Sequence, residues 1–271
     1  MDKYTVLKDY IASLGSVAVA FSGGVDSTFL LRVAHDVLGD KALAITLSSS
    51  FVPKRELEEA EALCRSIGAD HLVLNADVLA IDGVADNPPD RCYLCKRGIF
   101  SKILFTAREL GFAHVVEGSN VDDLGDYRPG LRAIDELGVK SPLRYANMTK
   151  SEIRELSREL GLPTWEKPSY ACLASRFVYG ERIIPEKLLM VERAEEFLRE
   201  LGFRQMRVRL HGNLARIELL PDDFGKMLDL REKVCDELKS YGFSYVSLDL
   251  KGYRAGSMND PLRSQSTAPA P

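Results

Sequence analysis

The chain has 271 residues, of which 45% are hydrophobic and 28% charged, and its formal net charge at pH 7 is −4. This composition is typical of a globular protein with one large domain or two modest ones. It argues against a nucleic-acid partner, and no apolar run approaches the roughly 20 residues that span a bilayer. Because the N-terminus shows no signal-peptide pattern, we expect a cytoplasmic protein whose cysteines serve as metal ligands or catalytic groups rather than in disulfides.

The first half of the chain alternates short apolar runs with helical patterns. Strands are predicted at 17–21, 42–47, 71–74 and 114–118, and helices at 28–38, 54–67 and 98–110. This alternation predicts right-handed βαβ units, and therefore an α/β fold with a parallel, doubly wound sheet. Ligands of such sheets bind beyond the carboxyl ends of the strands. A further helix, 150–160, is predicted to begin at a capping box formed by Thr149 and Glu152.

The pattern changes at Ile184. It predicts a helix at 185–201, strands at 205–210 and 215–219, a helix at 221–241 and a strand at 245–250. The order α-β-β-α-β indicates a smaller C-terminal α+β domain with an antiparallel hairpin that turns at residues 211–213. We therefore expect domains at 1–182 and 183–252, followed by a disordered tail at 253–271.

A turn rich in glycine and serine follows the first apolar run and opens the next helix. It consists of Ser22, Gly23, Gly24, Val25, Asp26 and Ser27. The two glycines permit a backbone whose N–H groups hold a phosphate at the helix N-terminus, and the two serines add hydroxyl donors. Asp26 suits Mg²⁺ binding or helix capping. The turn is neither a Walker A loop nor a dinucleotide fingerprint, and a capped helix without a ligand is the plain alternative.

The five cysteines divide into two groups. Cys64 and Cys235 lie within amphipathic helical patterns, which favours buried small side chains. Cys92 and Cys95 form a C-x-x-C motif, and Cys172 follows much later. Three thiolates suit a [4Fe–4S] cluster with one open iron, whereas a structural zinc would want four ligands. A redox pair and three unrelated cysteines stay open as alternatives.

Cys172 also has a basic neighbourhood in the sequence. Lys167 and Arg176 flank it, and nearby cations raise the thiolate fraction of a cysteine. Because basic residues are common on solvated surfaces, this pattern alone supports a reactive thiol only modestly.

The SGGVDS turn resembles the PP-loop of the ATP pyrophosphatases, enzymes of adenine nucleotide α-hydrolase-like fold that cleave ATP between its α- and β-phosphates. A larger part of the chain resembles the LarE family, ATP-dependent sulfur transferases that build the nickel-pincer nucleotide of lactate racemase. The resemblance rests on the PP-loop, residues 117–123 (EGSNVDD), 125–130 (GDYRPG), 172–176 (CLASR), 179–180 (YG) and the two arginines of 207–209.

This resemblance implies a substrate and a reaction. ATP with Mg²⁺ adenylates a carboxylate of pyridinium-3,5-biscarboxylic acid mononucleotide, and a sulfur nucleophile then displaces AMP to give a thiocarboxylate. One branch of the family sacrifices the cysteine that matches Cys172. The other branch holds a [4Fe–4S] cluster on three cysteines, as Cys92, Cys95 and Cys172 would. We expect the cluster branch, with an unknown sulfide donor and a homo-oligomeric state.

Three other functions are kept as alternatives. Sulfur could come from Cys172 itself, or the chain could be a cluster-dependent tRNA thiolase, although the acidic composition argues against tRNA. An ATP-binding regulatory module without catalytic activity would not need the set of three cysteines.

The resemblance also assigns roles to residues outside the PP-loop. Arg97 matches a position near the substrate, and Tyr93 offers a ring on which a pyridinium can stack. Gly118 admits the nucleotide, and Asp122 or Asp123 holds Mg²⁺. A polar loop that caps the next turn is the plain alternative for this last group.

A phosphate site is expected on the predicted strand 205–210. Arg207 and Arg209 are two residues apart and therefore point to one face. Guanidinium groups bind phosphate through paired hydrogen bonds, and Ser175 with Arg176 would complete the site. Glu218, on the partner strand, would orient the arginines. Without the resemblance, a solvated basic strand balanced by Glu218 would be the simpler interpretation.

Overall fold

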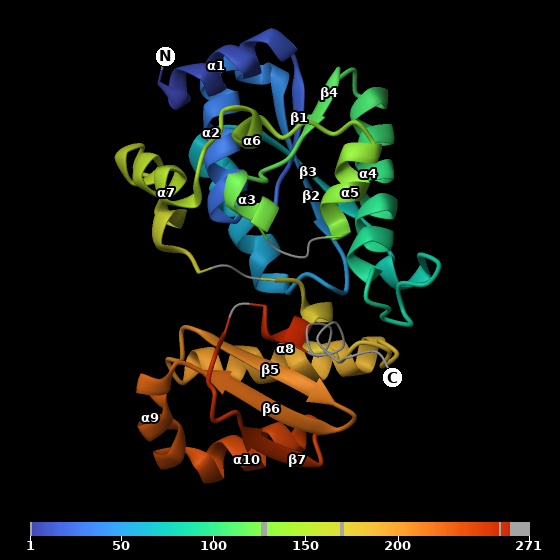
Figure 1. Cartoon of the computed structure of the whole chain (residues 1–271), viewed down its shortest axis with the longest axis vertical. Helices are drawn as coiled ribbons and strands as arrows, with labels where there is room; N and C mark the ends of the chain where they lie inside the picture. Colours follow the sequence, from blue (N-terminus) through green and yellow to red (C-terminus); the bar gives the residue numbers. More distant parts are fainter. Residues whose placement is uncertain (1, 126–128, 169–170, 255, 261–271) are drawn as a thin grey trace, which may run out of the picture. The chain divides into compact units, whose positions relative to one another are not determined.

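The computed structural model describes residues 2–125, 129–168, 171–254 and 256–260. Their contacts divide the chain into two compact units, shown in Figure 1. The first comprises Met1–Val84 with Pro89–Tyr170, and the second comprises Ala85–Pro88 with Ala171–Pro271. The expected boundary at residues 182 and 183 stays a prediction. In this division, residues 171–182 group with the second unit. None of the described helices is long and apolar enough to cross a bilayer.

The first unit contains a four-stranded parallel sheet in the order β3-β2-β1-β4. Its strands are β1 (Val17–Ala20), β2 (Ala42–Ser48), β3 (Asp70–Asn75) and β4 (His114–Val116). The predicted α/β fold with a parallel sheet is therefore confirmed. Because all four strands run in one direction, the loops that follow them emerge at the same edge of the sheet.

Helices cover both faces of this sheet (Figure 1). One face packs against α1 (Lys3–Leu14), α2 (Val25–Leu38), α3 (Lys54–Ile67), α6 (Pro142–Tyr145) and α7 (Lys150–Glu159). The other face packs against α4 (Arg91–Glu109) and α5 (Pro129–Glu136). Successive side chains of a strand point to opposite faces of the sheet. Val17 and Val19 therefore join the first core, and Ala18 joins the second.

Helix α4 begins at Arg91, earlier than the start predicted at residue 98. Gly98 lies inside this helix, where the absence of a side chain permits close packing. A Cβ at Gly98 would lie 2.7 Å from Cδ1 of Ile81. The consequence is that the C-x-x-C motif lies in the first turns of a long helix rather than in a loop.

The second unit is a small α+β fold, as predicted. Its sheet has the order β5-β6-β7, with β5 (Met206–His211) antiparallel to β6 (Leu214–Leu219) and β7 (Tyr245–Leu248) parallel to β6. The hairpin turns through Gly212, whose φ of 62° favours glycine. Helix α8 (Pro185–Glu200) packs on β5 and α10 (Arg231–Ser240) on β7.

Two segments of the second unit differ from the expected pattern. The single helix predicted at 221–241 is divided at Leu230 into α9 (Phe224–Asp229) and α10. Within the tail predicted to be disordered, the structure describes 253–254 and 256–260, with a short helical turn η7 at Ser257–Asn259. Residues 255 and 261–271 lie outside the described residues.

Candidate functional site

The PP-loop joins β1 to α2. Gly23 has a φ of 67°, and Gly24 precedes the first turn of α2 in an extended conformation. The hydroxyl oxygens of Ser22 and Ser27 lie 3.1 Å apart, and the amide of Ser22 donates to Ser27 Oγ over 3.3 Å. A glycine cap leaves the first amides of α2 without a capping side chain among the described residues. The arrangement therefore suits an anion at the positive end of a 14-residue helix.

Gly118 brings the loop after β4 against this helix start. A Cβ at residue 118 would lie 3.0 Å from the backbone nitrogen of Ser27 and 3.2 Å from Cβ of Asp26. Only a residue without a side chain allows this approach. It allows the side-chain amide of Asn120 to donate to Asp26 Oδ1 over 3.2 Å, so residues that follow β1 and β4 meet at one site.

Acidic side chains gather around this contact. Asp26 forms an ion pair with Lys150 Nζ, and the backbone amide of Lys150 donates to Asp122 Oδ2 over 2.8 Å. Asn120 Oδ1 accepts from the backbone amide of Asp122 over 3.0 Å, and the backbone amide of Asn120 donates to Asp123 Oδ2 over 3.0 Å. Carboxylate oxygens beside phosphate-binding amides are the ligands that Mg²⁺ takes in nucleotide sites, so this chemistry fits Mg²⁺ and ATP.

Lys167 belongs to the PP-loop surroundings. Its Nζ donates to the carbonyl oxygen of Gly23 over 3.1 Å and pairs with Glu56 and Glu59 of α3 at 2.7 and 2.8 Å. Arg154 of α7 donates to the carbonyl oxygen of Lys167 over 2.9 Å. These contacts lie in the first unit, and the expected effect of Lys167 on Cys172 stays a prediction.

The C-x-x-C motif lies on one side of α4. Cys92 and Cys95 are three residues apart on the helix, so their side chains are neighbours, and both are half-buried. Nη2 of the buried Arg91 lies 3.6 Å from Cys92 Sγ. A cation beside a thiol favours the thiolate, which is the form that binds iron.

The ring of Tyr93 already has a cationic neighbour. The guanidinium carbon of Arg132 lies 3.8 Å from the ring centroid, and that of the exposed Arg97 lies 5.7 Å away. The Tyr93 hydroxyl donates to Glu136 Oε2 over 2.7 Å. The ring predicted to stack on a pyridinium is therefore in contact with the guanidinium of Arg132 in this structure.

Cys172 belongs to the second unit, where it is exposed and precedes the short helical turn η5 (Leu173–Arg176). Among the described residues, no group of three His, Cys, Asp or Glu side chains is arranged to hold a metal ion. The fit to a [4Fe–4S] cluster therefore rests on the chemistry of the donors. The residues Cys92 and Cys95 are half-buried, and Cys172 is exposed.

Arg176 is buried, and each of its three guanidinium nitrogens donates hydrogen bonds within the second unit. Its Nε and Nη2 donate to the two carboxylate oxygens of Glu195 at 2.9 and 2.8 Å, and its Nη1 donates to the carbonyl oxygen of Cys172 at 3.0 Å and to Ser175 Oγ at 2.9 Å. Burial opposes ionisation of Glu195, but the charge and hydrogen bonds of Arg176 outweigh it and lower the pKa of that carboxyl. Arg176 thus fixes the backbone around Cys172.

Arg209 forms a second buried pair. Its Nε and Nη2 donate to the two oxygens of Glu218 at 3.1 and 3.0 Å, and its Nη1 donates to the carbonyl oxygen of Ser175 over 2.6 Å. Glu218 is fully buried and also pairs with Arg216 at 2.9 Å. As expected for strand neighbours, Arg207 lies on the same face of β5, but the described ion pairs of Glu218 are with Arg209 and Arg216.

Arg207 lies in a region where buried positive groups outnumber buried negative groups. Its Nη1 donates to the carbonyl oxygen of Met206 over 2.6 Å, and its guanidinium lies 5.2 Å from the ring of Tyr253. Burial, followed by the charge of Arg176, lowers the pKa of Arg207. Three buried guanidinium groups therefore share a region with two buried carboxylates, those of Glu195 and Glu218. Such an excess favours an anionic ligand.

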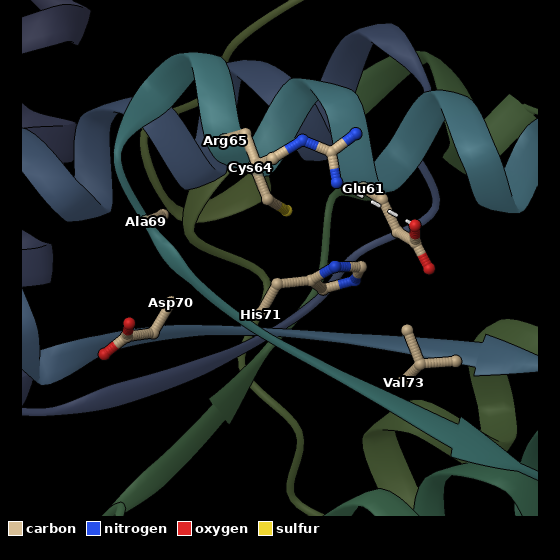
Figure 2. A pocket seen from close by; sticks show the side chains of 7 residues that line it. All are labelled: Glu61, Cys64, Arg65, Ala69, Asp70, His71 and Val73. Atoms are coloured by element: carbon tan, nitrogen blue, oxygen red, sulfur yellow. Dashed lines mark ion pairs between the residues drawn. The ribbon is translucent and has the colours of Figure 1, made fainter.

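A separate hollow of about 340 Å³ lies between α3 and the beginning of β3 (Figure 2). The ring of His71 points from β3 toward α3, and His71 Nε2 lies 2.8 Å from Thr46 Oγ1. Burial lowers the pKa of His71 and raises the pKa of Cys64 to about 12. Burial therefore favours the neutral form of both groups, and the buried Cys64 matches its predicted packing role.

A strand, an SGGVDS turn and a helix with acidic groups beside it define a PP-loop nucleotide-binding protein. The family model of NAD synthase matches residues 2–84. The chain is 45% identical to an uncharacterized protein of Synechocystis sp., over 94% of this chain and 96% of the relative. It is 34% identical to an uncharacterized protein of Methanocaldococcus jannaschii, over 88% of this chain and 91% of the relative.

The chain is also 40% identical to the pyridinium-3,5-bisthiocarboxylic acid mononucleotide synthase of Lactiplantibacillus plantarum, over 96% of this chain and 95% of that enzyme. It therefore belongs to this synthase family, the LarE family that its motifs resemble. The prediction that the chain is an enzyme of this family is confirmed.

Proposed function

We propose that the protein is an ATP-dependent sulfur transferase that acts on pyridinium-3,5-biscarboxylic acid mononucleotide. The observation that carries the proposal is the contact of the PP-loop with the acidic group after β4, in a chain of this synthase family. A substrate carboxylate oxygen attacks the α-phosphorus of ATP, and pyrophosphate leaves. A sulfur nucleophile then attacks the acyl carbon, a C–S bond forms, the C–O bond to AMP breaks, and a thiocarboxylate results.

The residues of the first unit serve the adenylation step. The amides of the PP-loop and of the first turn of α2 bind phosphate oxygens, with the hydroxyls of Ser22 and Ser27 beside them. Asp26 and Asp122 would hold Mg²⁺, which neutralises phosphate charge when bound. Gly118 keeps Asp26 close to the loop after β4. Lys167 restrains the loop through the carbonyl oxygen of Gly23.

The arginines of the second unit serve substrate binding. We assign the 5′-phosphate to Arg207 and Arg209, with Ser175 and Arg176 at the same site. Glu195 and Glu218 fix Arg176 and Arg209 through paired hydrogen bonds, and the excess of buried positive charge attracts a dianion. Arg97 and Tyr93 are assigned to the pyridinium dicarboxylate part, where a cation and an aromatic face complement its charges.

Sulfur delivery is assigned to Cys92, Cys95 and Cys172, whose thiolates would hold a [4Fe–4S] cluster. When bound, such a cluster supplies an open iron that can carry hydrosulfide. The second candidate is sacrificial transfer, in which the sulfur of Cys172 attacks the acyl carbon and displaces AMP. Loss of the Cα proton of residue 172 with cleavage of its Cβ–S bond then releases the thiocarboxylate and leaves dehydroalanine. The exposure of Cys172 favours this candidate, because an exposed thiol can reach a substrate.

Anaerobic purification with iron and sulfide analysis, followed by intact-mass measurement after turnover, separates the two routes. We expect iron and sulfide in the wild type, an unchanged mass after turnover, and loss of iron and of thiocarboxylate formation in Cys92→Ala. Cys235→Ala is the matched control, since Cys235 lies on α10 in the second unit. An iron-free protein with full activity in Cys92→Ala, and loss of the mass of H₂S from Cys172, would contradict the cluster route.

The cellular location and the oligomeric state are also proposals. We place the enzyme in the cytoplasm as a homo-oligomer, which sedimentation analysis of the purified protein tests. The alternative of a tRNA thiolase predicts a gel shift with tRNA. The net charge of −4 argues against such binding.

A further inference from the structure

The chain that leaves β7 folds back over the buried arginines of the second unit. We call residues 252–254 and 256–260 the C-terminal turn. Its first residue, Gly252, has a φ of 67°, and a Cβ there would lie 2.7 Å from the carbonyl oxygen of Leu219. The next amide, that of Tyr253, donates to the same carbonyl over 2.7 Å. Glycine therefore allows the turn to begin directly at the end of β6.

Tyr253 places its ring against Arg207. The guanidinium carbon lies 5.2 Å from the ring centroid, within the range of a cation–π contact. Arg207 is 3% exposed, and an aromatic face stabilises a cation more strongly when water is excluded. The ring thus limits the orientations of the Arg207 guanidinium. Burial and the charge of Arg176 both disfavour the charged form of this group.

Ser257 completes the second arginine pair. Its Oγ accepts from Arg209 Nη2 over 2.8 Å and donates to Glu218 Oε1 over 3.1 Å. Asn259 Oδ1 accepts from the hydroxyl of Tyr179 over 3.0 Å, so the far end of the turn is tied to the segment that follows Cys172. Ser257 and Asn259 are buried polar residues, as expected for side chains whose hydrogen bonds are satisfied inside the fold.

We propose that Tyr253 and Ser257 are positioning residues for a phosphate monoester, Tyr253 by holding Arg207 and Ser257 by holding Arg209 against Glu218. This inference rests on the proposed function, because it deepens the assignment of the phosphate site. Strand β5 alone supplies two charges two residues apart. The C-terminal turn fixes the directions of their N–H groups, which paired hydrogen bonds to phosphate require.

Point variants with matched controls test the two roles. Binding of inorganic phosphate and of the pyridinium dicarboxylate mononucleotide is measured by titration calorimetry. Tyr253→Leu should weaken both by about tenfold, whereas Tyr253→Phe, which keeps the ring, should stay near the wild type. Ser257→Ala should weaken both by roughly threefold to tenfold, and Ser257→Thr should restore binding. The control variants Tyr245→Leu and Ser244→Ala change exposed residues of the same unit and should change binding by less than about twofold.

Kinetics separates positioning from general damage. In Tyr253→Leu the KM for the mononucleotide should rise, while kcat and the dissociation constant for ATP stay at wild-type values. A chain ended after Asp260 should bind phosphate like the full chain, and one ended after Lys251 should lose phosphate binding. Unchanged phosphate affinity in both Tyr253→Leu and Ser257→Ala would overturn the positioning roles and leave the proposed phosphate site standing. A wild-type protein that binds ATP but neither phosphate nor the mononucleotide would overturn the phosphate assignment together with it.

Discussion

At the scale of single residues, the charge of Asp26 is shared between two partners on other elements. Lys150 comes from the start of α7 and Asn120 from the loop after β4. In the proposed reaction, a cation held by Asp26 would release the Lys150 ammonium toward the phosphates assigned to the same loop. Lys150 is therefore expected to stabilise the charge that develops on departing pyrophosphate.

Lys150→Gln should lower the rate of AMP formation by roughly 10²-fold to 10³-fold, as expected for the loss of one preorganised charged donor. The measurement is a single-turnover assay of AMP and pyrophosphate release. Lys41→Gln removes the same charge from an exposed residue at the opposite end of the sheet, just before β2, and should leave the rate unchanged. Equal rates in Lys150→Gln and in the wild type would contradict this role.

A substitution at Gly118 tests the close contact between the loop after β4 and the start of α2. In Gly118→Ala the new methyl group would meet the backbone of Ser27 and Asp26 at 3.0 to 3.2 Å, so the loop after β4 must move away from α2. We expect ATP affinity to fall by about tenfold or more, since overpacking of this kind typically costs about 1–3 kcal/mol. Gly225→Ala is the control, because a Cβ there meets nothing within 4 Å. Calorimetric ATP titration gives the comparison, and equal affinities in the two variants would exclude the steric role.

At the scale of secondary-structure elements, α7 is fixed where it supplies Lys150 to the PP-loop. Thr149 and Glu152 form the predicted capping box, and Lys3 of α1 pairs with Glu152 at 2.8 Å. The hydrogen bond from Lys3 and those from Thr149 lower the pKa of Glu152 from its ordinary value of 4.5 to about 2. Because the folded state favours the ionised carboxyl, this contribution to stability is complete above pH 4.5 and is lost as the pH falls toward 2.

Glu152→Gln should therefore lower the free energy of unfolding at pH 7, and the difference from the wild type should shrink as the pH falls from 4.5 to 2. Urea unfolding at a series of pH values measures this difference. The control is Glu155→Gln, which removes an exposed carboxyl from the same helix. A difference that stays constant across this pH range would contradict the assigned pair.

At the scale of the whole molecule, the sequence predicts what is local and misses what is distant. The parallel sheet, the PP-loop, the capping box of α7 and the hairpin of the second unit follow from apolar periodicity and turn residues. The start of α4 does not, because Gly98 has the local signature of a break while its true role is contact with Ile81. Lys150 reaches Asp26 across 124 residues, and no local pattern carries that information.

The contacts of the buried arginines likewise involve residues that no local sequence pattern connects. The spacing of Arg207 and Arg209 predicts a shared face, and Glu218 was expected to orient them. Glu195, the partner of Arg176, lies on helix α8, and Ser257, which accepts from Arg209, lies on a turn 48 residues farther along the chain than Arg209. The helical pattern of 185–201 marks Glu195 as an inward position among apolar residues, which is the signal that could have identified it. Ser257 lies in a polar stretch that composition alone assigns to a disordered tail.

The two arginines should affect the stability of the molecule in opposite ways. Burial and the charge of Arg176 disfavour the charged form of Arg207, so Arg207→Met should raise the free energy of unfolding while abolishing phosphate binding. Arg209→Met leaves the fully buried Glu218 with less compensation and should cost about 3–5 kcal/mol. Urea unfolding and phosphate titration of both variants give the comparison. A destabilised Arg207→Met that still binds phosphate would show that Arg207 is structural. A stabilised variant without phosphate binding would show that the molecule retains a costly buried charge because its ligand requires it.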